Sequence, residues 1–217
     1  MKIFTKKEIL PIALIIIAFI VGLQLYPNLP DSIPTHWNAQ GDVDGWGSKN
    51  FAVFFSPLLA LGVYLLMTFI PLIDPLRKKY KDFAIYYFWI KTIIILFFLA
   101  LYFYTLAVAK GFNMNINYFI LPAISILFMV FGSFMPKIKK NYFVGVRTPW
   151  TIHSEEVWNE THKFAGKSFM IMGAVSLLSL LIKEYTFPIF IIVILIGSLS
   201  PVVYSYFVFK KIGGFKK

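Results

Sequence analysis

The chain has 217 residues, of which 59% are hydrophobic and only 14% are charged, and its formal net charge is +11. A soluble domain of this length cannot bury so much apolar surface, since even a domain of about 300 residues leaves roughly a quarter of its unfolded surface exposed. The composition therefore excludes an ordinary soluble protein, and the absence of cysteine excludes disulfides and thiolate chemistry.

Six apolar blocks are long enough, or nearly so, to cross a membrane as helices, which takes about 20 mainly apolar residues. In chain order they run over about Ile9–Tyr26, Phe51–Ile73, Phe83–Ala109, Tyr118–Met135, Phe164–Ile182 and Phe187–Phe209. The first block has the basic start of a signal peptide, but no small-residue cleavage site follows it, so we expect it to be retained. The predicted fold class is an all-α integral membrane protein with about six transmembrane helices.

Basic residues gather on one side of this predicted bundle. Seventeen of the 21 lysines and arginines fall at the chain ends or in the second-to-third and fourth-to-fifth connections. They are Lys2, Lys6, Lys7, Arg77, Lys78, Lys79, Lys81, Lys137, Lys139, Lys140, Arg147, Lys163, Lys167, Lys210, Lys211, Lys216 and Lys217. Cytoplasmic loops retain such residues, which predicts a cell-membrane protein with both termini in the cytoplasm. Because they form no single stripe, we expect no direct contact with nucleic acid.

The connection over residues 27–50 is then an outer loop. Its three prolines disfavour helix and favour an extended path, and its glycines allow tight turns. Asp42, Asp44 and Gly45 have part of the spacing of a calcium loop, but Trp46 occupies a ligand position, so we expect no metal. Two interpretations stay open: an ordered turn with Trp37 and Trp46 at the headgroups, or a surface that contacts a molecule arriving from outside.

The connection over residues 136–166 is a cytoplasmic loop with the opposite character. Ser154 is a good N-cap for a helix that begins at about Glu155, with two glutamates in its first turn. We expect this helix to be amphipathic, to lie at the interface and to lead directly into the fifth span. Arg147 could clamp an anion, but pairing with Glu155 or Glu156 is the expected outcome.

Lys91 lies about seven residues inside the predicted third span. Its side chain could reach back to the headgroups, or it could pair with another group inside the bundle. No acidic residue lies near the centre of any span, which counts against a proton- or cation-coupled transporter.

The two long loops together resemble a known family. The cytoplasmic loop matches the signature of the SdpI family, multi-pass bacterial membrane proteins, at Asn141, Gly145, Arg147, Thr148, Pro149, Trp150, Thr151, Ser154, Glu156, Trp158, His162 and Gly166. The outer loop is similar to a small N-terminal membrane domain of unknown function that is often fused to that family, at Pro34, His36, Trp37, Asn38, Gly41, Asp44, Gly45 and Lys49. The resemblance covers about residues 1–70 and 110–215. It implies a two-span domain over residues 1–75 and a four-span domain over residues 76–217.

The resemblance implies a function in toxin immunity or toxin sensing. A well-known member of the family protects its cell from a secreted peptide toxin and is described as binding a cytoplasmic repressor. We therefore expect a non-enzymatic immunity protein without cofactor or metal, whose partners are the lipid bilayer, a secreted peptide toxin outside and a cytoplasmic repressor inside. The expected toxin-facing residues are Pro34, His36, Trp37, Asn38, Asp44 and Trp46. The expected partner-binding residues are Asn141, Gly145, Arg147, Thr148, Pro149, Trp150, Thr151, Glu156, Trp158 and His162.

Three alternatives remain. A membrane enzyme acting on a lipid or envelope substrate would use His153, Glu156, Glu160 or His162. A small transporter would need a water-accessible path past Lys91. A regulatory anchor would hold a soluble partner at the cytoplasmic loop.

Overall fold

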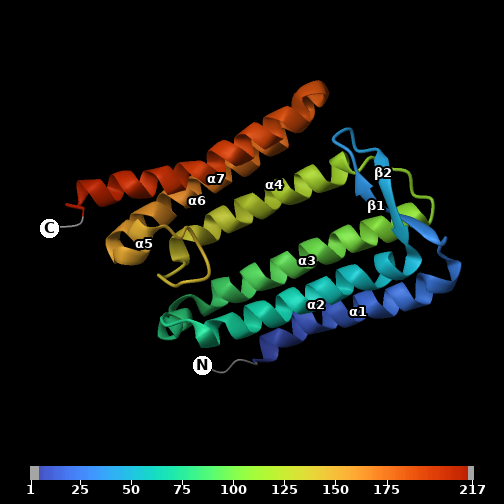
Figure 1. Ribbon diagram of the computed structural model, residues 1–217, viewed down its shortest axis with the longest axis horizontal. Helices are drawn as coiled ribbons and strands as arrows, with labels where there is room; N and C mark the ends of the chain where they lie inside the picture. Colours follow the sequence, from blue (N-terminus) through green and yellow to red (C-terminus); the bar gives the residue numbers. More distant parts are fainter. Residues whose placement is uncertain (1–4, 215–217) are drawn as a thin grey trace. The chain divides into compact units, whose positions relative to one another are not determined.

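The computed structural model describes residues 5–214, so Lys2, Lys216 and Lys217 of the charge count lie outside the described residues. In the described part, six helices are long and apolar enough to cross a membrane, which confirms the predicted fold class. These six helices (Figure 1) are α1 (Ile9–Leu25), α2 (Lys49–Ile73), α3 (Ala84–Ala109), α4 (Asn117–Phe134), α6 (Glu155–Leu178) and α7 (Thr186–Lys211). The protein is a multi-pass membrane protein.

Three further elements, besides short 3₁₀ turns, lie between these helices. The outer loop forms an antiparallel hairpin of β1 (Ser32–Trp37) and β2 (Val43–Ser48), whose register is irregular on both sides of His36. The extended path expected from the prolines is confirmed, but the strand pairing was not predicted. The third element, also unpredicted, is the five-residue helix α5 (Pro149–His153).

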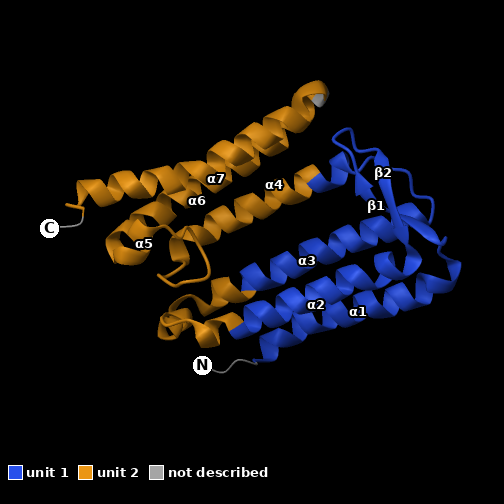
Figure 2. Ribbon diagram, in the orientation of Figure 1, with its two compact units in different colours: residues 1–69, 89–120 blue, residues 70–88, 121–217 orange. Residues whose placement is uncertain are grey.

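The chain divides into two compact units (Figure 2). Unit 1 comprises residues 1–69 and 89–120, and unit 2 comprises residues 70–88 and 121–217, so α2, α3 and α4 each contribute to both. The sequence-domain boundary expected at residues 75/76 stays a prediction. In unit 1, α1, α2 and α3 pack around a core that includes Ala18, Ala60 and Ile95, each 0% exposed.

Burial in both units is typical of a protein whose solvent is lipid. Small hydroxyl side chains such as Ser125, Ser176 and Ser205 are fully buried, whereas Leu66 and Ile73 expose 61% and 70% of their surface. In lipid, the hydrophobic effect does not drive helices together, so close backbone approach and hydrogen bonds stabilise the contacts between helices.

In unit 2, α4 and α6 approach closely at a pair of glycines. A Cβ added at Gly132 would lie 2.8 Å from the Gly166 carbonyl oxygen, and a Cβ at Gly166 would lie 2.8 Å from the Gly132 carbonyl oxygen. Only residues without a side chain permit this contact. The contact holds α6 against α4 just beyond the loop that connects them.

Helix α6 begins where the sequence predicted. Ser154 is its N-cap, with its hydroxyl accepting from the Val157 N–H at 3.4 Å, and Glu155 and Glu156 occupy the first turn. One uninterrupted helix then runs to Leu178, so the expected interfacial helix and the fifth span are a single element.

Candidate functional site

The loop between α4 and α6, residues 138–154, is called the signature loop below, and it folds around one amide side chain. Asn141 is fully buried, and its Oδ1 accepts hydrogen bonds from the backbone N–H groups of Phe143 (2.8 Å) and Val144 (2.7 Å). Its Nδ2 donates to the carbonyls of Lys139 and Val144, both at 2.9 Å. The side chain therefore satisfies four backbone groups of a tight turn, as short amides do in loops.

A buried carboxylate fixes this turn to the connection between α2 and α3. Asp74 accepts hydrogen bonds from the Leu76 N–H (2.6 Å), the Tyr80 hydroxyl (2.9 Å) and the Tyr142 N–H (3.0 Å). The Tyr80 hydroxyl also lies 3.4 Å from Oδ1 of Asn141. Three hydrogen-bond donors offset the cost of removing the carboxylate from water. Asp74 therefore connects the signature loop to the segment between α2 and α3, a role that the sequence did not predict. The available signal was a lone aspartate at the end of an apolar block.

Trp158 and His162 hold the next part of the signature loop against α6. The Trp158 Nε1–H donates to the Ile138 carbonyl at 2.9 Å, and the two rings stack with centroids 4.0 Å apart. Nε2 of His162 accepts from the Val146 N–H at 3.1 Å, and Nδ1 lies 2.8 Å from the Trp158 carbonyl oxygen. Because Nε2 is the acceptor and the carbonyl needs a donor, the proton resides on Nδ1.

Position 145, beside this histidine, accommodates only glycine. Its φ is +112°, and a Cβ at this position would collide with Nε2 of His162. Both the left-handed backbone and the close approach therefore require glycine.

Helix α5 is fixed at its start by a reciprocal pair of threonines. The Thr148 hydroxyl accepts from the Thr151 N–H (3.2 Å), and the Thr151 hydroxyl accepts from the Thr148 N–H (2.8 Å). Pro149 occupies the first helical position, where its missing N–H has no consequence. The Thr148 hydroxyl also lies 3.0 Å from that of Ser205, which ties the loop to α7.

The Arg147 side chain contacts the backbone of the signature loop. It is exposed, and its Nη1 donates to the Tyr142 carbonyl at 2.8 Å. The expected pairing of Arg147 with Glu155 or Glu156 is wrong, because the backbone carbonyl lies within its reach and Glu155 instead pairs with Lys79 at 2.7 Å. Nη1 makes the one hydrogen bond that the guanidinium forms with the described residues, and a guanidinium has five N–H donors.

The expected partner-binding residues differ in exposure. Arg147, Pro149 and Glu156 are exposed, Gly145 and Trp150 are partly exposed, and Asn141, Thr148, Thr151, Trp158 and His162 are buried. The Trp150 ring packs edge-on against Tyr206 of α7 at 5.2 Å. The buried residues build the loop, and the exposed and partly exposed ones form its surface.

Two of the four residues named for an enzyme, Glu160 and His162, have other contacts. Both ring nitrogens of His162 are used inside the fold, and Glu160 pairs with Lys163 at 2.7 Å. Among the described residues, no group of three or more His, Asp or Glu side chains is placed to hold a metal ion.

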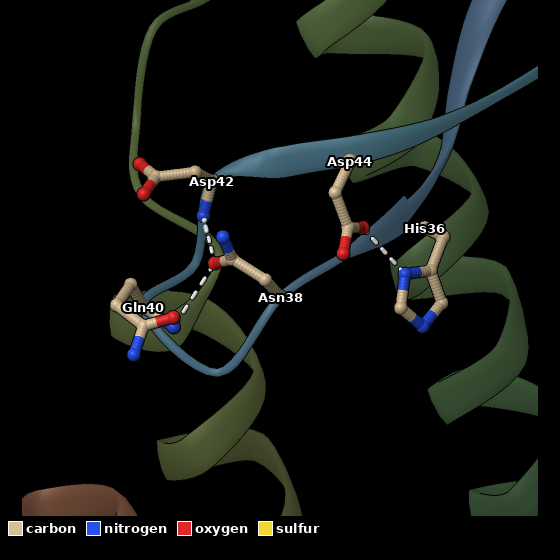
Figure 3. A network of polar contacts seen from close by, with 5 residues as sticks. All are labelled: His36, Asn38, Gln40, Asp42 and Asp44. Atoms are coloured by element: carbon tan, nitrogen blue, oxygen red, sulfur yellow. Dashed lines mark hydrogen bonds and ion pairs between the residues drawn. The ribbon is translucent and has the colours of Figure 1, made fainter.

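The second candidate site is the tip of the hairpin in unit 1 (Figure 3). Asn38 Oδ1 accepts from the backbone N–H groups of Gln40 (3.0 Å) and Asp42 (2.9 Å). The same residue pairs through its backbone with Asp42 and Gly41, which has a φ of +85°. Asn38 is therefore the residue that makes the turn.

Two asparagines outside the hairpin hold this tip. Nδ2 of Asn115 donates to the Gln40 carbonyl at 2.7 Å, and Nδ2 of Asn117 donates to the Ala39 carbonyl at 3.0 Å. Asn115 lies in the connection between α3 and α4, and Asn117 is the first residue of α4. The hairpin tip is thus attached within unit 1 and presents a fixed surface.

The six expected toxin-facing residues have unequal exposure. His36 and Asp44 are exposed and pair with each other, with Nδ1 and Oδ1 2.5 Å apart (Figure 3), and Trp46 is 61% exposed. Trp37 packs edge-on against Tyr104, and Asn38 is partly buried in its own turn. Pro34 is buried. His36, Asp44 and Trp46 are therefore the exposed members of this set, and Trp37 and Asn38 are partly exposed.

Unit 1 also contains a buried ion pair. Nζ of Lys91 lies 2.7 Å from Oε2 of Glu8 and donates to the Thr68 hydroxyl at 3.1 Å. The ammonium also lies 4.8 Å from the centre of the Tyr64 ring. Of the two expectations for Lys91, pairing inside the bundle is confirmed. Glu8 was missed because it directly precedes the first apolar block.

Both candidate sites lie in segments that match known families. Residues 137–205 match the SdpI/YfhL protein family, and residues 13–61 match a domain of unknown function, DUF1648. The chain is 30% identical over 210 residues to a protein named "Immunity protein SdpI" from Bacillus subtilis (strain 168), which covers 96% of this chain and 99% of that protein. No solved structure matches the chain. The resemblance seen in the two loops is confirmed.

Proposed function

This chain belongs to the SdpI/YfhL protein family, and we propose that it is a multi-pass membrane immunity protein that protects its cell against a secreted toxic peptide. The observation that carries the proposal is the near-complete match to a relative named for immunity. The alignment spans 96% of this chain, so it includes the hairpin, the six spans and the signature loop together.

We also propose an arrangement for this function. Both termini and the signature loop lie in the cytoplasm and the hairpin lies outside, because the basic residues favour this orientation. A toxin then contacts His36, Asp44 and Trp46 of the hairpin, and a cytoplasmic repressor contacts Arg147 and its exposed neighbours. An exposed tryptophan and an arginine with free donors are the side chains that most often dominate binding surfaces.

A survival assay tests the immunity function directly. A strain of Bacillus subtilis that lacks its own relative would express this chain, the relative as a positive control, or an empty vector, and each would be grown with the toxin-producing parent strain. We expect this chain to restore survival. Loss of survival at a membrane level equal to that of the rescuing relative would contradict the proposal.

Variants of exposed residues then separate the mechanisms. Arg147→Ala should insert normally and abolish co-purification of a soluble partner, whereas Lys163→Ala on the same side serves as a control for lost charge. Unchanged partner capture by Arg147→Ala would reject the regulator contact. Glu156→Gln should leave survival unchanged, and its loss at equal membrane level would favour the enzyme instead.

A further inference from the structure

A groove between α6 and α7 of unit 2 is apolar along nearly all of its length. Its volume is about 410 Å³, within the range of roughly 300–1,000 Å³ that is usual for sites holding small molecules. Its walls are formed by Phe164, Ile171 and Val175 of α6 and by Val193 and Ile196 of α7. Ile171 and Ile196 expose 63% and 64% of their surface, so the walls need an apolar cover.

The polar side chains of this groove lie next to each other on α6. Ser168 is already used, since its hydroxyl donates to the Gly197 carbonyl at 2.9 Å and lies 3.1 Å from that of Ser200. Lys167 is exposed and makes no ion pair with any described residue. The lining contains no carboxylate, so the groove carries one unpaired positive charge beside an apolar trough.

The distance from this charge along the groove matches one leaflet of a bilayer. Eight residues separate Lys167 from Val175, which at about 1.5 Å per residue is roughly 12 Å. Half of a hydrocarbon core of about 30 Å is about 15 Å. A lipid whose headgroup lies at Lys167 can therefore place its acyl chain along the whole trough.

We propose that this groove binds an anionic phospholipid, with its phosphate against Lys167 and one acyl chain between α6 and α7. The unpaired ammonium selects a net negative headgroup, because the ammonium of a zwitterionic lipid would repel it. The apolar walls give no further headgroup selectivity. This inference does not rest on the proposed immunity function.

Native mass spectrometry of the full chain in mild detergent tests the proposal, with phosphatidylglycerol and phosphatidylcholine of identical acyl chains as probes. We expect the first phosphatidylglycerol to bind about fivefold more tightly than phosphatidylcholine, as one interfacial lysine contributes. Lys167→Gln should remove this preference. Lys163→Gln, which removes the same charge from the same helix, should retain it, because Lys163 pairs with Glu160.

A second pair of variants tests the acyl-chain trough. Val175→Trp fills the groove and should lower the affinity for both lipids, whereas Leu199→Trp lies on α7 outside its lining and should not. An unchanged thermal transition in the same detergent would show that each variant is folded. A preference that survives Lys167→Gln, or that falls equally with Lys163→Gln, would overturn the proposal. A dimer that binds no lipid would also overturn it and assign the groove to a second copy of the chain.

Discussion

Two ion pairs of this protein have the same N···O distance and very different burial, so they should differ greatly in coupling energy. Lys91–Glu8 and Lys79–Glu155 are both 2.7 Å long. The side chains of the first pair are 3% and 10% exposed, and those of the second are 30% and 57% exposed. The perturbation is removal of one partner, and then of both, in each pair.

The expected magnitudes follow from burial. Lys91→Met leaves the Glu8 carboxylate buried without its cation and should lower the free energy of unfolding by about 3–5 kcal/mol. Adding Glu8→Leu should recover most of this loss, because no unpaired charge then stays buried. For Lys79 and Glu155, water competes with the contact, and the coupling energy should be about 0.2–1 kcal/mol.

The assay is unfolding in mixed micelles of mild detergent and dodecyl sulfate, followed by tryptophan fluorescence. Each double-mutant cycle uses the two single variants and the double variant of one pair, so the exposed pair is the matched control. Equal coupling energies for the two pairs would refute the reasoning, as would a Lys91→Met variant that the second substitution does not rescue.

Three further predictions follow. Gly145→Ala should lower the free energy of unfolding by about 1–3 kcal/mol more than Gly111→Ala does in the same micelles. Both glycines have a positive φ, but only Gly145 lies against His162. Equal losses for the two variants would contradict the expected collision. Trp158→Phe keeps an aromatic ring but removes the indole N–H that donates to the Ile138 carbonyl and leaves part of the buried space unfilled, so it should lower the free energy of unfolding by at least about 1–3 kcal/mol. Trp46→Phe, at an exposed position, should change the free energy of unfolding by no more than about 0.5 kcal/mol. The sequence lacks cysteine, so a single introduced cysteine can report which side of the membrane it faces. In the proposed orientation, Ser48→Cys should react with a membrane-impermeant maleimide on intact cells, and Glu156→Cys should react only after permeabilisation. The reverse pattern would contradict the proposed orientation.

The spans could be predicted from the sequence because hydropathy and helix capping are local properties. The Ser154 N-cap placed the start of α6 correctly, although the apolar block was expected only from Phe164. The hairpin was harder, since prolines and glycines break the alternation that identifies strands. Its tip is also held by hydrogen bonds from Asn115 and Asn117, which lie far from the hairpin in the sequence.

The sequence pointed to the signature loop as a candidate site, but it did not show what each residue of the loop does. The signature residues Asn141, Trp158 and His162 have polar atoms and were taken as contacts for a partner. The structure shows that these atoms satisfy backbone groups of the signature loop itself. A residue that binds a partner and a residue that builds a buried turn can both be polar and lie in the same loop. The sequence therefore could not distinguish these two roles.

The sequence by itself determined that this chain is a membrane protein and roughly which segments cross the membrane. It also determined where α6 begins and which family the chain resembles. These conclusions rest on apolar block length, charge near block ends and short motifs, all of which act over a few residues. Only the tertiary structure decided that Lys91 pairs with Glu8 and that Asp74 binds the Tyr142 N–H. Those partners lie 83 and 68 positions apart, and packing of whole helices brings them together, which no local pattern specifies.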